Sequence, residues 1–314
     1  MIMASIAVDA SLCLLYILLN AALNFSNRMV LGVSGFRFPL TLTTGHMLLN
    51  PLFLSPLMFL LTSYRKQHRD IILERAKALA IVAVCNGVQI ALNNSSLVHI
   101  ELSTNQVMRA IMPVVVALVE TTQRKVPPLR QLCMLSLISA GVALVVYEPG
   151  GSESEWFGVM LVAGSVLLQA VQMVFAGGLL AGKLDSFQIT FYTSPPACAT
   201  LLFPAIIVEG STFRSYAVAR PDWTAGVVFG TCALAVLYNV VMFQTIKRLS
   251  AVGSAVLGNV KIVTLLLFSR LMGEMQLWTQ RQFFGCALTF GSAMMYSALK
   301  LRAAPVTVKK AAAS

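Results

Sequence analysis

Runs of apolar residues, each about as long as a membrane-spanning helix, recur along almost the whole chain. A helix rises ~1.5 Å per residue, so about 20 apolar residues are needed to cross the hydrocarbon layer of a bilayer. The pattern therefore predicts an all-α membrane protein with ten transmembrane helices. We place them near residues 8–31, 38–61, 78–98, 103–122, 130–147, 157–181, 187–209, 223–246, 253–272 and 282–301.

Composition supports this interpretation and narrows the functional classes. The chain has 314 residues, of which 57% are hydrophobic and 11% charged, and its mean hydropathy is +0.79. Soluble domains contain about 25% charged residues. The six cysteines lie in apolar runs without metal-ligand spacing, so we expect buried thiols, no metal site and no cofactor. Catalytic-triad, zinc-protease and phosphate-loop motifs are missing from the sequence, which argues against an enzyme.

Basic residues test the helix count, because cytosolic loops of membrane proteins carry an excess of Lys and Arg. Ten helices place both termini on one side, and fifteen of the 23 basic residues fall on that side. We therefore predict that both termini are cytosolic, with a short basic tail at 303–314. The net charge of +11 is divided among short loops, so nucleic acid is not an expected partner.

A weak internal duplication divides the chain. The stretches "ALNNSSLV" (91–98) and "VLYNVVMF" (236–243) superpose at an offset of 145 residues. We predict a first five-helix repeat at 1–150 and a second at 151–302. Because five is an odd number, the second repeat must be inverted relative to the first. Inverted repeats with a binding site near the bilayer midplane are typical of secondary transporters.

Two basic residues lie well inside apolar runs, Arg109 in the fourth and Lys261 in the ninth. A charge in that position costs roughly 2.5 kcal/mol or more unless something offsets it. Each side chain could extend to the nearer interface, but both lie roughly 10–13 Å deep, at the limit of that reach. We favour the alternative that they bind the phosphate groups of an anionic ligand, Arg109 bidentately and Lys261 as a mobile point charge.

Neutral polar residues in the same runs could supply further ligand contacts, although each fits hydrogen bonding between helices equally well. Tyr238 and Asn239 are the strongest of these, because the duplication places them on a helix expected to line the cavity. Pro113, four residues after Arg109, is expected to kink the fourth helix and open backbone beside the site. The complete set of candidate binding residues is Lys261, Arg109, Asn259, Tyr238, Asn239, Asn94, Gln106, Asn27 and Tyr192.

Four stretches together resemble the nucleotide-sugar and triose-phosphate translocator branch of the drug/metabolite transporter superfamily, which includes solute carrier family 35. They are "NRMVLGVSGFRFPLTLTTGHM" (27–47), "NNSSLVHIELSTNQVMRAIMPVVVAL" (93–118), "GKLDSFQITFYTSPPA" (182–197) and "LSAVGSAVLGNVKIVTLLLFSRLMGE" (249–274). The resemblance covers almost the whole chain in order. It implies a ten-helix antiporter that exchanges a phosphorylated sugar or nucleotide sugar for phosphate or a nucleoside monophosphate.

The resemblance also implies roles for particular residues. Arg109 matches the basic residue of the family's fourth helix, and Lys261 matches the phosphate-binding lysine of its ninth helix. Ile262 follows that lysine where triose-phosphate carriers tend to have Arg, which favours nucleotide sugars over triose phosphates. Arg28 and Arg109 also stand where lysine is commoner.

Two other functions remain open at this point. One is a metabolite or drug exporter of the same superfamily with a non-phosphorylated substrate; the other is a non-transporting membrane scaffold. Only about seven residues precede the first apolar run, too few for an organelle transit peptide, so we expect the Golgi or endoplasmic reticulum. The expected partners are the lipid bilayer, an anionic small-molecule substrate and its counter-substrate, and a homodimer is left open.

Overall fold

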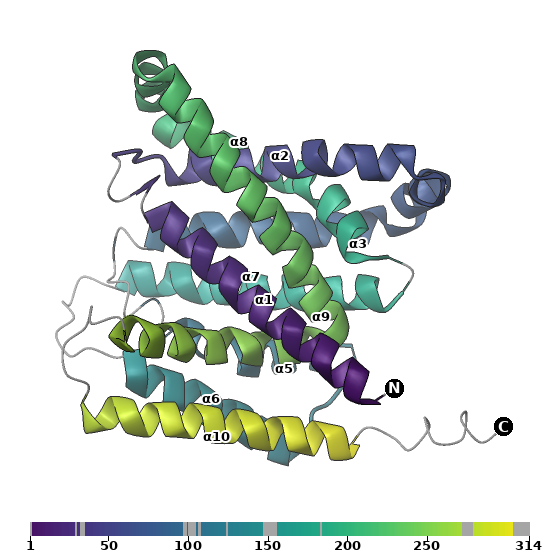
Figure 1. Ribbon diagram of the computed structural model, residues 1–314, viewed down its shortest axis with the longest axis vertical. Helices are drawn as coiled ribbons and strands as arrows, with labels where there is room; N and C mark the ends of the chain where they lie inside the picture. Colours follow the sequence, from purple (N-terminus) through teal and green to yellow (C-terminus); the bar gives the residue numbers. More distant parts are fainter. Residues whose placement is uncertain are drawn as a thin grey trace. The chain divides into compact units, whose positions relative to one another are not determined.

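The computed structural model describes residues 2–28, 30–31, 35–96, 99, 105, 108–123, 125–146, 156–182, 184–271 and 279–303. Apart from short connections, this part of the chain is helical (Figure 1). The elements are α1 (Ile2–Arg28), α2 (Pro39–Leu60), α3 (Thr62–Ser96), α5 (Met112–Thr121), α6 (Leu129–Val146), α7 (Trp156–Ala181), α8 (Ser186–Ala219), α9 (Pro221–Leu271) and α10 (Gln280–Ala303).

The prediction of an all-helical membrane protein is confirmed in its broad form. Within the described residues, four helical segments are long and apolar enough to cross a membrane: Ala7–Asn27, Trp156–Ala181, Ser186–Ala219 and Pro221–Val263. Shorter apolar helices occupy Met112–Thr121 and Leu129–Val145. The count of ten transmembrane helices and their origin in two inverted repeats remain predictions.

Several helices are longer than their apolar runs. α3 begins at Thr62, sixteen residues before the predicted span at 78–98, and α8 continues ten residues beyond the predicted end at 209. The added part of α3 contains Arg, Lys, Glu and Gln, which lose little conformational freedom in a helix. Hydropathy marks where a helix contacts lipid, and it does not mark where the helix ends.

α9 runs through two predicted spans and is interrupted at Ser250, whose φ of 73° and ψ of 169° are not helical. Among the described non-glycine residues, Ser250 has the only positive φ. Its side-chain oxygen accepts a long hydrogen bond of 3.4 Å from the Gly253 backbone amide. Ser250 therefore acts as a cap from which the helix restarts, in place of the loop expected between 246 and 253.

The chain packs as two compact units, which we describe separately. Unit 1 contains residues 1–99 and 154–254, and unit 2 contains residues 100–153 and 255–314. Each unit therefore combines helices from both predicted repeats, so the repeats at 1–150 and 151–302 remain a prediction about the chain's internal duplication.

In unit 1 the first turn of α2 is held by the carboxylate of Glu209 from α8. Its Oε1 accepts a hydrogen bond of 2.9 Å from the Leu40 amide, and its Oε2 accepts bonds of 2.7 Å from both the amide and the hydroxyl of Thr41. Phe38, the residue before the helix, provides no side-chain cap. The buried carboxylate thus satisfies amides that have no partner within the helix and carries negative charge to the positive end of the helix dipole.

The start of α8 is joined to the first turns of α3. Asp185 and Gln188 form a reciprocal capping box at the beginning of α8. The Tyr64 hydroxyl donates to Asp185 Oδ2 at 2.6 Å, and the Gln188 amide donates to Gln67 Oε1 at 3.0 Å. Burial and the neighbouring carboxylate raise the pKa of Tyr64 to about 12, so the phenol remains a hydrogen-bond donor at physiological pH.

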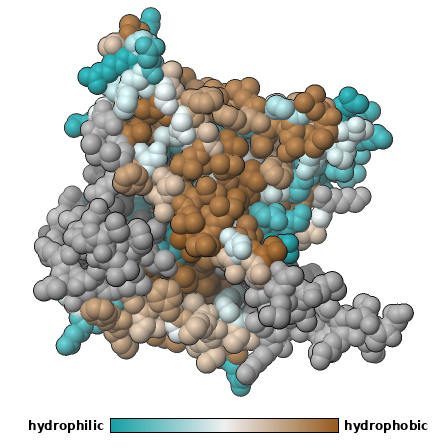
Figure 2. Space-filling view, in the orientation of Figure 1, coloured by the Kyte–Doolittle hydropathy of each residue, from teal (hydrophilic) through white to brown (hydrophobic). Residues whose placement is uncertain are grey.

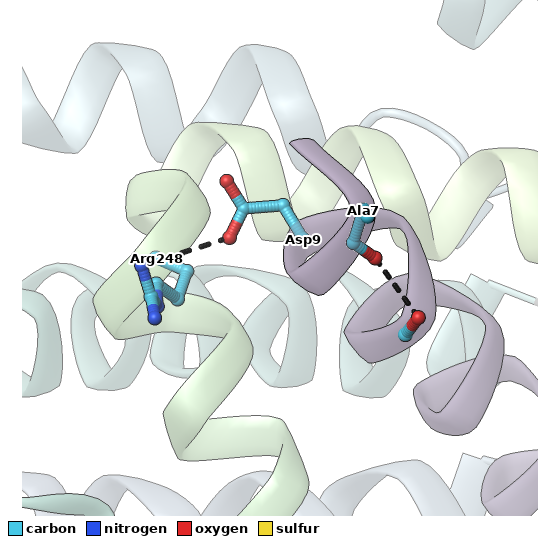
Figure 3. A network of polar contacts seen from close by, with 4 residues as sticks. Ala7, Asp9 and Arg248 are labelled. Carbon is cyan, nitrogen blue, oxygen red and sulfur yellow. Dashed lines mark hydrogen bonds and ion pairs between the residues drawn. The ribbon is translucent and has the colours of Figure 1, made fainter. Parts of the chain in front are cut away.

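α1 lies beside the first part of α9 (Figure 1). The ring of Tyr16 stacks on Tyr238 with centroids 5.8 Å apart. Nearer the N-terminus, Asp9 Oδ1 lies 3.8 Å from Arg248 Nη1 (Figure 3). Figure 2 shows a mainly apolar face over this part of unit 1, with hydrophilic residues gathered at the far end of α8.

In unit 2, α6 packs against α10 at very close range, because two glycines face each other. A methyl group added to Gly141 would lie 2.8 Å from the Gly285 carbonyl oxygen and would also meet the Thr289 hydroxyl. A methyl group at Gly285 would lie 2.7 Å from the Gly141 carbonyl oxygen. Small residues at such a crossing let helix backbones approach one another, as in many membrane helix pairs.

Replacing Glu209 by Gln should destabilise unit 1, because the amide group of Gln would face backbone N–H donors. We expect a loss of about 1–3 kcal/mol of unfolding free energy, the usual cost of buried donors left without an acceptor. Thermal unfolding in detergent measures it. Glu74→Gln, an exposed acid of the same unit, is the control and should match wild type. Equal stability of both variants would contradict the role given to Glu209.

Replacing Gly141 by Ala should force α6 and α10 apart and lower the unfolding temperature, by roughly 1–3 kcal/mol in free energy as for other overpacked sites. Gly291→Ala on α10 is the matched control, because a methyl group there meets no described atom within 4 Å. The control should be neutral or slightly stabilising, since Ala favours helix over Gly. The close packing would be refuted if the two variants unfolded at the same temperature.

Candidate functional site

Arg109 and Lys261, the two embedded basic residues, both belong to unit 2. Lys261 is a partly buried residue of α9, and Arg109 lies in the helical turn that precedes α5. Their positive charges are close enough to interact electrostatically. The structure therefore brings together two residues that are separated by about 150 positions in the sequence. A pair of like charges in an apolar unit favours the approach of an anion.

The helix that carries Arg109 is broken beside it. Ala110 and Ile111 form a turn, and α5 then begins with Pro113 in its first turn. The amide of Val114 donates to the Ile111 carbonyl at 3.0 Å, one residue short of its usual helical partner, the carbonyl of Ala110. The break falls where the sequence predicted a kink, and its cause is that proline has no N–H and crowds the preceding turn.

Asn259 of α9 contacts this break directly. Its side-chain Nδ2 donates a hydrogen bond of 2.7 Å to the carbonyl oxygen of Ala110, and the side chain is only 2% exposed. The sequence predicts a ligand contact for Asn259. The structure shows that one of its amide donors is engaged with the backbone next to Arg109.

One face of α9 is packed and the other carries Lys261. Ile262 and Val263 lie one turn after Asn259 and belong to an apolar cluster with Ala110, the other members of which are Val142, Val145, Cys286 and Phe290. At 100° per residue, Lys261 points away from this face. Gly258 shares the Lys261 side, and a methyl group there would meet no described atom within 4 Å.

The remaining described candidates belong to unit 1. Tyr238 stacks on Tyr16, and Asn239 beside it is partly buried. The hydroxyl of Tyr192 lies 2.7 Å from Nδ1 of His68, to which its ring is also packed. Asn27 lies at the end of α1, and its buried Oδ1 has no hydrogen-bond partner among the described residues.

Two candidates cannot be placed. Gln106 and the side chain of Asn94 lie outside the part of the chain that the structure describes. The predicted ligand contacts of these two residues therefore stay predictions.

Sequence reasoning missed several polar groups that the structure places inside unit 1. Asp9, paired with Arg248, was absent from the list of embedded charges, although an acid near the start of an apolar run is a visible signal. His46 and Asn50 are one turn apart on α2 and buried; His46 Nε2 and Asn50 Oδ1 find no partner among the described residues. Asn50 also donates to the Ser194 hydroxyl at 2.9 Å.

Comparison with known proteins gives one family. The model of the Triose-phosphate Transporter family matches residues 7–297. A protein of Arabidopsis thaliana named "Probable sugar phosphate/phosphate translocator" is 28% identical over 92% of this chain and 86% of its own length. A second Arabidopsis protein with the same description is 29% identical over 85% of this chain and 75% of its own length. Human solute carrier family 35 member E4 is 26% identical over 91% and 79%.

A solved crystal structure shares the fold. It superposes with a TM-score of 0.61 and covers 95% of this chain and 99% of its own, at 14% sequence identity. This similarity concerns the arrangement of helices alone.

Replacing Lys261 by Gln should stabilise the ligand-free protein, because it removes a charge that is costly to bury and that Arg109 repels. We expect a gain on the order of 1 kcal/mol, measured as a higher unfolding temperature in phosphate-free detergent. Inorganic phosphate should then stabilise wild type but not the variant. Arg130→Gln, which removes an exposed charge of the same unit, is the control. A lower unfolding temperature for Lys261→Gln than for this control would refute the repulsive pair.

Proposed function

The chain belongs to the Triose-phosphate Transporter family, and on that basis we propose that it is an antiporter exchanging a phosphorylated sugar for phosphate across an endomembrane. Members of this family are transporters, and no enzymatic activity is part of the proposal. The substrate is an anionic small molecule, and the lipid bilayer is the medium in which the protein works.

The observation that carries the proposal is the placement of Arg109 and Lys261 in one compact unit, where their charges influence each other. An anion with a phosphate group would offset both charges at once. The planar guanidinium of Arg109 can bind two phosphate oxygens together, while the ammonium of Lys261 makes weaker, adjustable contacts. A ligand held in this way can be bound firmly on one side of the membrane and released on the other.

The names of the relatives favour a sugar phosphate as substrate and phosphate as counter-substrate. A nucleotide sugar exchanged for a nucleoside monophosphate is the second candidate. The sequence favoured this second candidate, because Ile262 follows the lysine and offers a ligand neither charge nor hydroxyl. In the structure Ile262 packs in the apolar cluster. The test below distinguishes the two classes.

The neutral candidates stay a proposal from the sequence. Tyr238 and Asn239, with Tyr192, Asn27, Asn94 and Gln106, would recognise the sugar or base through hydrogen bonds. Transport would proceed by alternating access, with the binding residues exposed first to one side and then to the other. Cytosolic termini, the two inverted repeats, a Golgi or endoplasmic reticulum location and a homodimer remain predictions from the sequence.

Two other functions are kept as alternatives. An exporter with a non-phosphorylated substrate would not need the charges of Arg109 and Lys261 for transport. A membrane scaffold would show no saturable exchange at all. Saturable exchange, and its dependence on these two charges, can be measured on purified protein and distinguishes both alternatives from the antiporter.

The proposal predicts saturable counterflow in proteoliposomes. Vesicles are preloaded with phosphate, UMP or GMP, and uptake of labelled sugar phosphates and nucleotide sugars is measured for wild type. Lys261→Gln and Arg109→Gln should each raise KM roughly 10- to 100-fold or abolish uptake, because each removes a charge-assisted contact to phosphate.

Arg130→Gln is the control for charge and should transport like wild type. Exchange that needs phosphate as preload would identify a sugar-phosphate carrier, and exchange that needs UMP or GMP a nucleotide-sugar carrier. Undiminished transport of a phosphate ester by Lys261→Gln would remove the assigned site. If folded wild type exchanged nothing with any preload, an exporter or a scaffold would be the better interpretation.

A further inference from the structure

The break beside Arg109 leaves backbone groups without their usual helical hydrogen bonds in an apolar environment. Proline at 113 cannot donate to the carbonyl of Arg109, and the amide of Val114 has turned to Ile111. The carbonyl of Ala110 therefore lacks the donor that a continuous helix would give it. A buried carbonyl without a donor is costly, so a break here needs a partner from another helix.

Asn259 supplies that partner from α9. The bond is short at 2.7 Å, and both residues are buried, Ala110 at 0% exposure and Asn259 at 2%. The same face of α9 continues into Ile262 and Val263, which pack around Ala110. One polar contact and one apolar cluster thus fix α9 to the residue that follows Arg109.

We infer that Asn259 is a positioning residue: by holding the broken turn at Ala110 it sets Arg109 and Lys261 at the separation needed to share one anion. The inference rests on the proposed function of these two cations. Asn259 and Lys261 are two residues apart and lie on opposite sides of α9. Asn259 therefore acts through the backbone and not by contact with the ligand, which departs from the role predicted for it from the sequence.

Pro113 and Asn259 should be energetically coupled, because the Ala110 carbonyl needs the hydrogen bond from Asn259 only while proline breaks the helix. In Pro113→Ala the new N–H can donate to Arg109 and the amide of Val114 can return to Ala110. The Ala110 carbonyl would then no longer need Asn259. A straightened helix would also move Arg109, so affinity for the anion should not return along with stability.

The test is a double-mutant cycle of Asn259→Ala and Pro113→Ala in the full chain, with two readouts. Thermal unfolding gives stability, and the inorganic phosphate concentration that gives half of the maximal stabilisation gives affinity. We expect Asn259→Ala to be less stable than wild type and to bind phosphate roughly tenfold more weakly, as for other residues that orient a binding group. The double variant should unfold close to Pro113→Ala while its phosphate affinity stays low.

Other outcomes would overturn the inference. Weaker phosphate binding by Asn259→Ala with wild-type stability and no coupling to Pro113→Ala would indicate direct contact with the ligand. Lower stability with wild-type affinity would indicate a purely structural residue. If Asn259→Ala does not fold, the stability of the double variant decides: unfolding close to that of Pro113→Ala supports the inference, and a double variant that also fails to fold refutes it.

The variants also distinguish a failure of the proposed function from a failure of the positioning role of Asn259. If Lys261→Gln bound phosphate as tightly as wild type, the anion site itself would be wrong whatever Asn259 did. If Lys261→Gln lost binding while Asn259→Ala kept it, only the positioning role would fall.

Discussion

A polar backbone group that is shielded from water must find its partner inside the protein, and much of this structure follows from that constraint. At three described places where a helix starts or breaks, a side chain supplies the missing partner. Glu209 satisfies the start of α2, Ser250 caps the restart of α9, and Asn259 satisfies the break before α5. Two of these three side chains, Glu209 and Asn259, belong to a different helix from the group they satisfy. These hydrogen bonds therefore also join one helix to another.

Charged groups show two contrasting arrangements. In unit 1, Asp9 lies 3.8 Å from Arg248, and this pair of opposite charges is partly exposed to solvent. In unit 2, Arg109 and Lys261 carry the same charge and interact unfavourably. Like charges close to one another cost stability. In the proposed function an anion offsets both charges, and transport requires that this anion be able to leave.

The sequence predicted the parts of the protein that depend on composition and local pattern. Apolar runs located most helices, and Arg109 and Lys261 stood out because charge is rare in such runs. Helix ends were harder to predict than helix positions. α3, for example, begins among charged residues that suit a helix as well as a loop. The role of Glu209 could not be predicted, because its partners Leu40 and Thr41 are almost 170 positions away and nothing local marks the contact. Asn259 was predicted as a ligand contact, yet its partner is a backbone carbonyl, which no sequence pattern displays.

The spacing of Asn259 and Lys261 has a physical reason of its own. Residues two apart on a helix point about 160° from each other, so one can be buried in the packed face while the other lies on the opposite side. A spacing of three or four would put both on one face, where the amide would compete with the ammonium for the same anion. Ile262 and Val263 extend the packed face, while Gly258 and Lys261 lie on the other side of the helix. The short segment from Gly258 to Val263 thus separates the residues that pack against Ala110 from Lys261, the proposed binding residue.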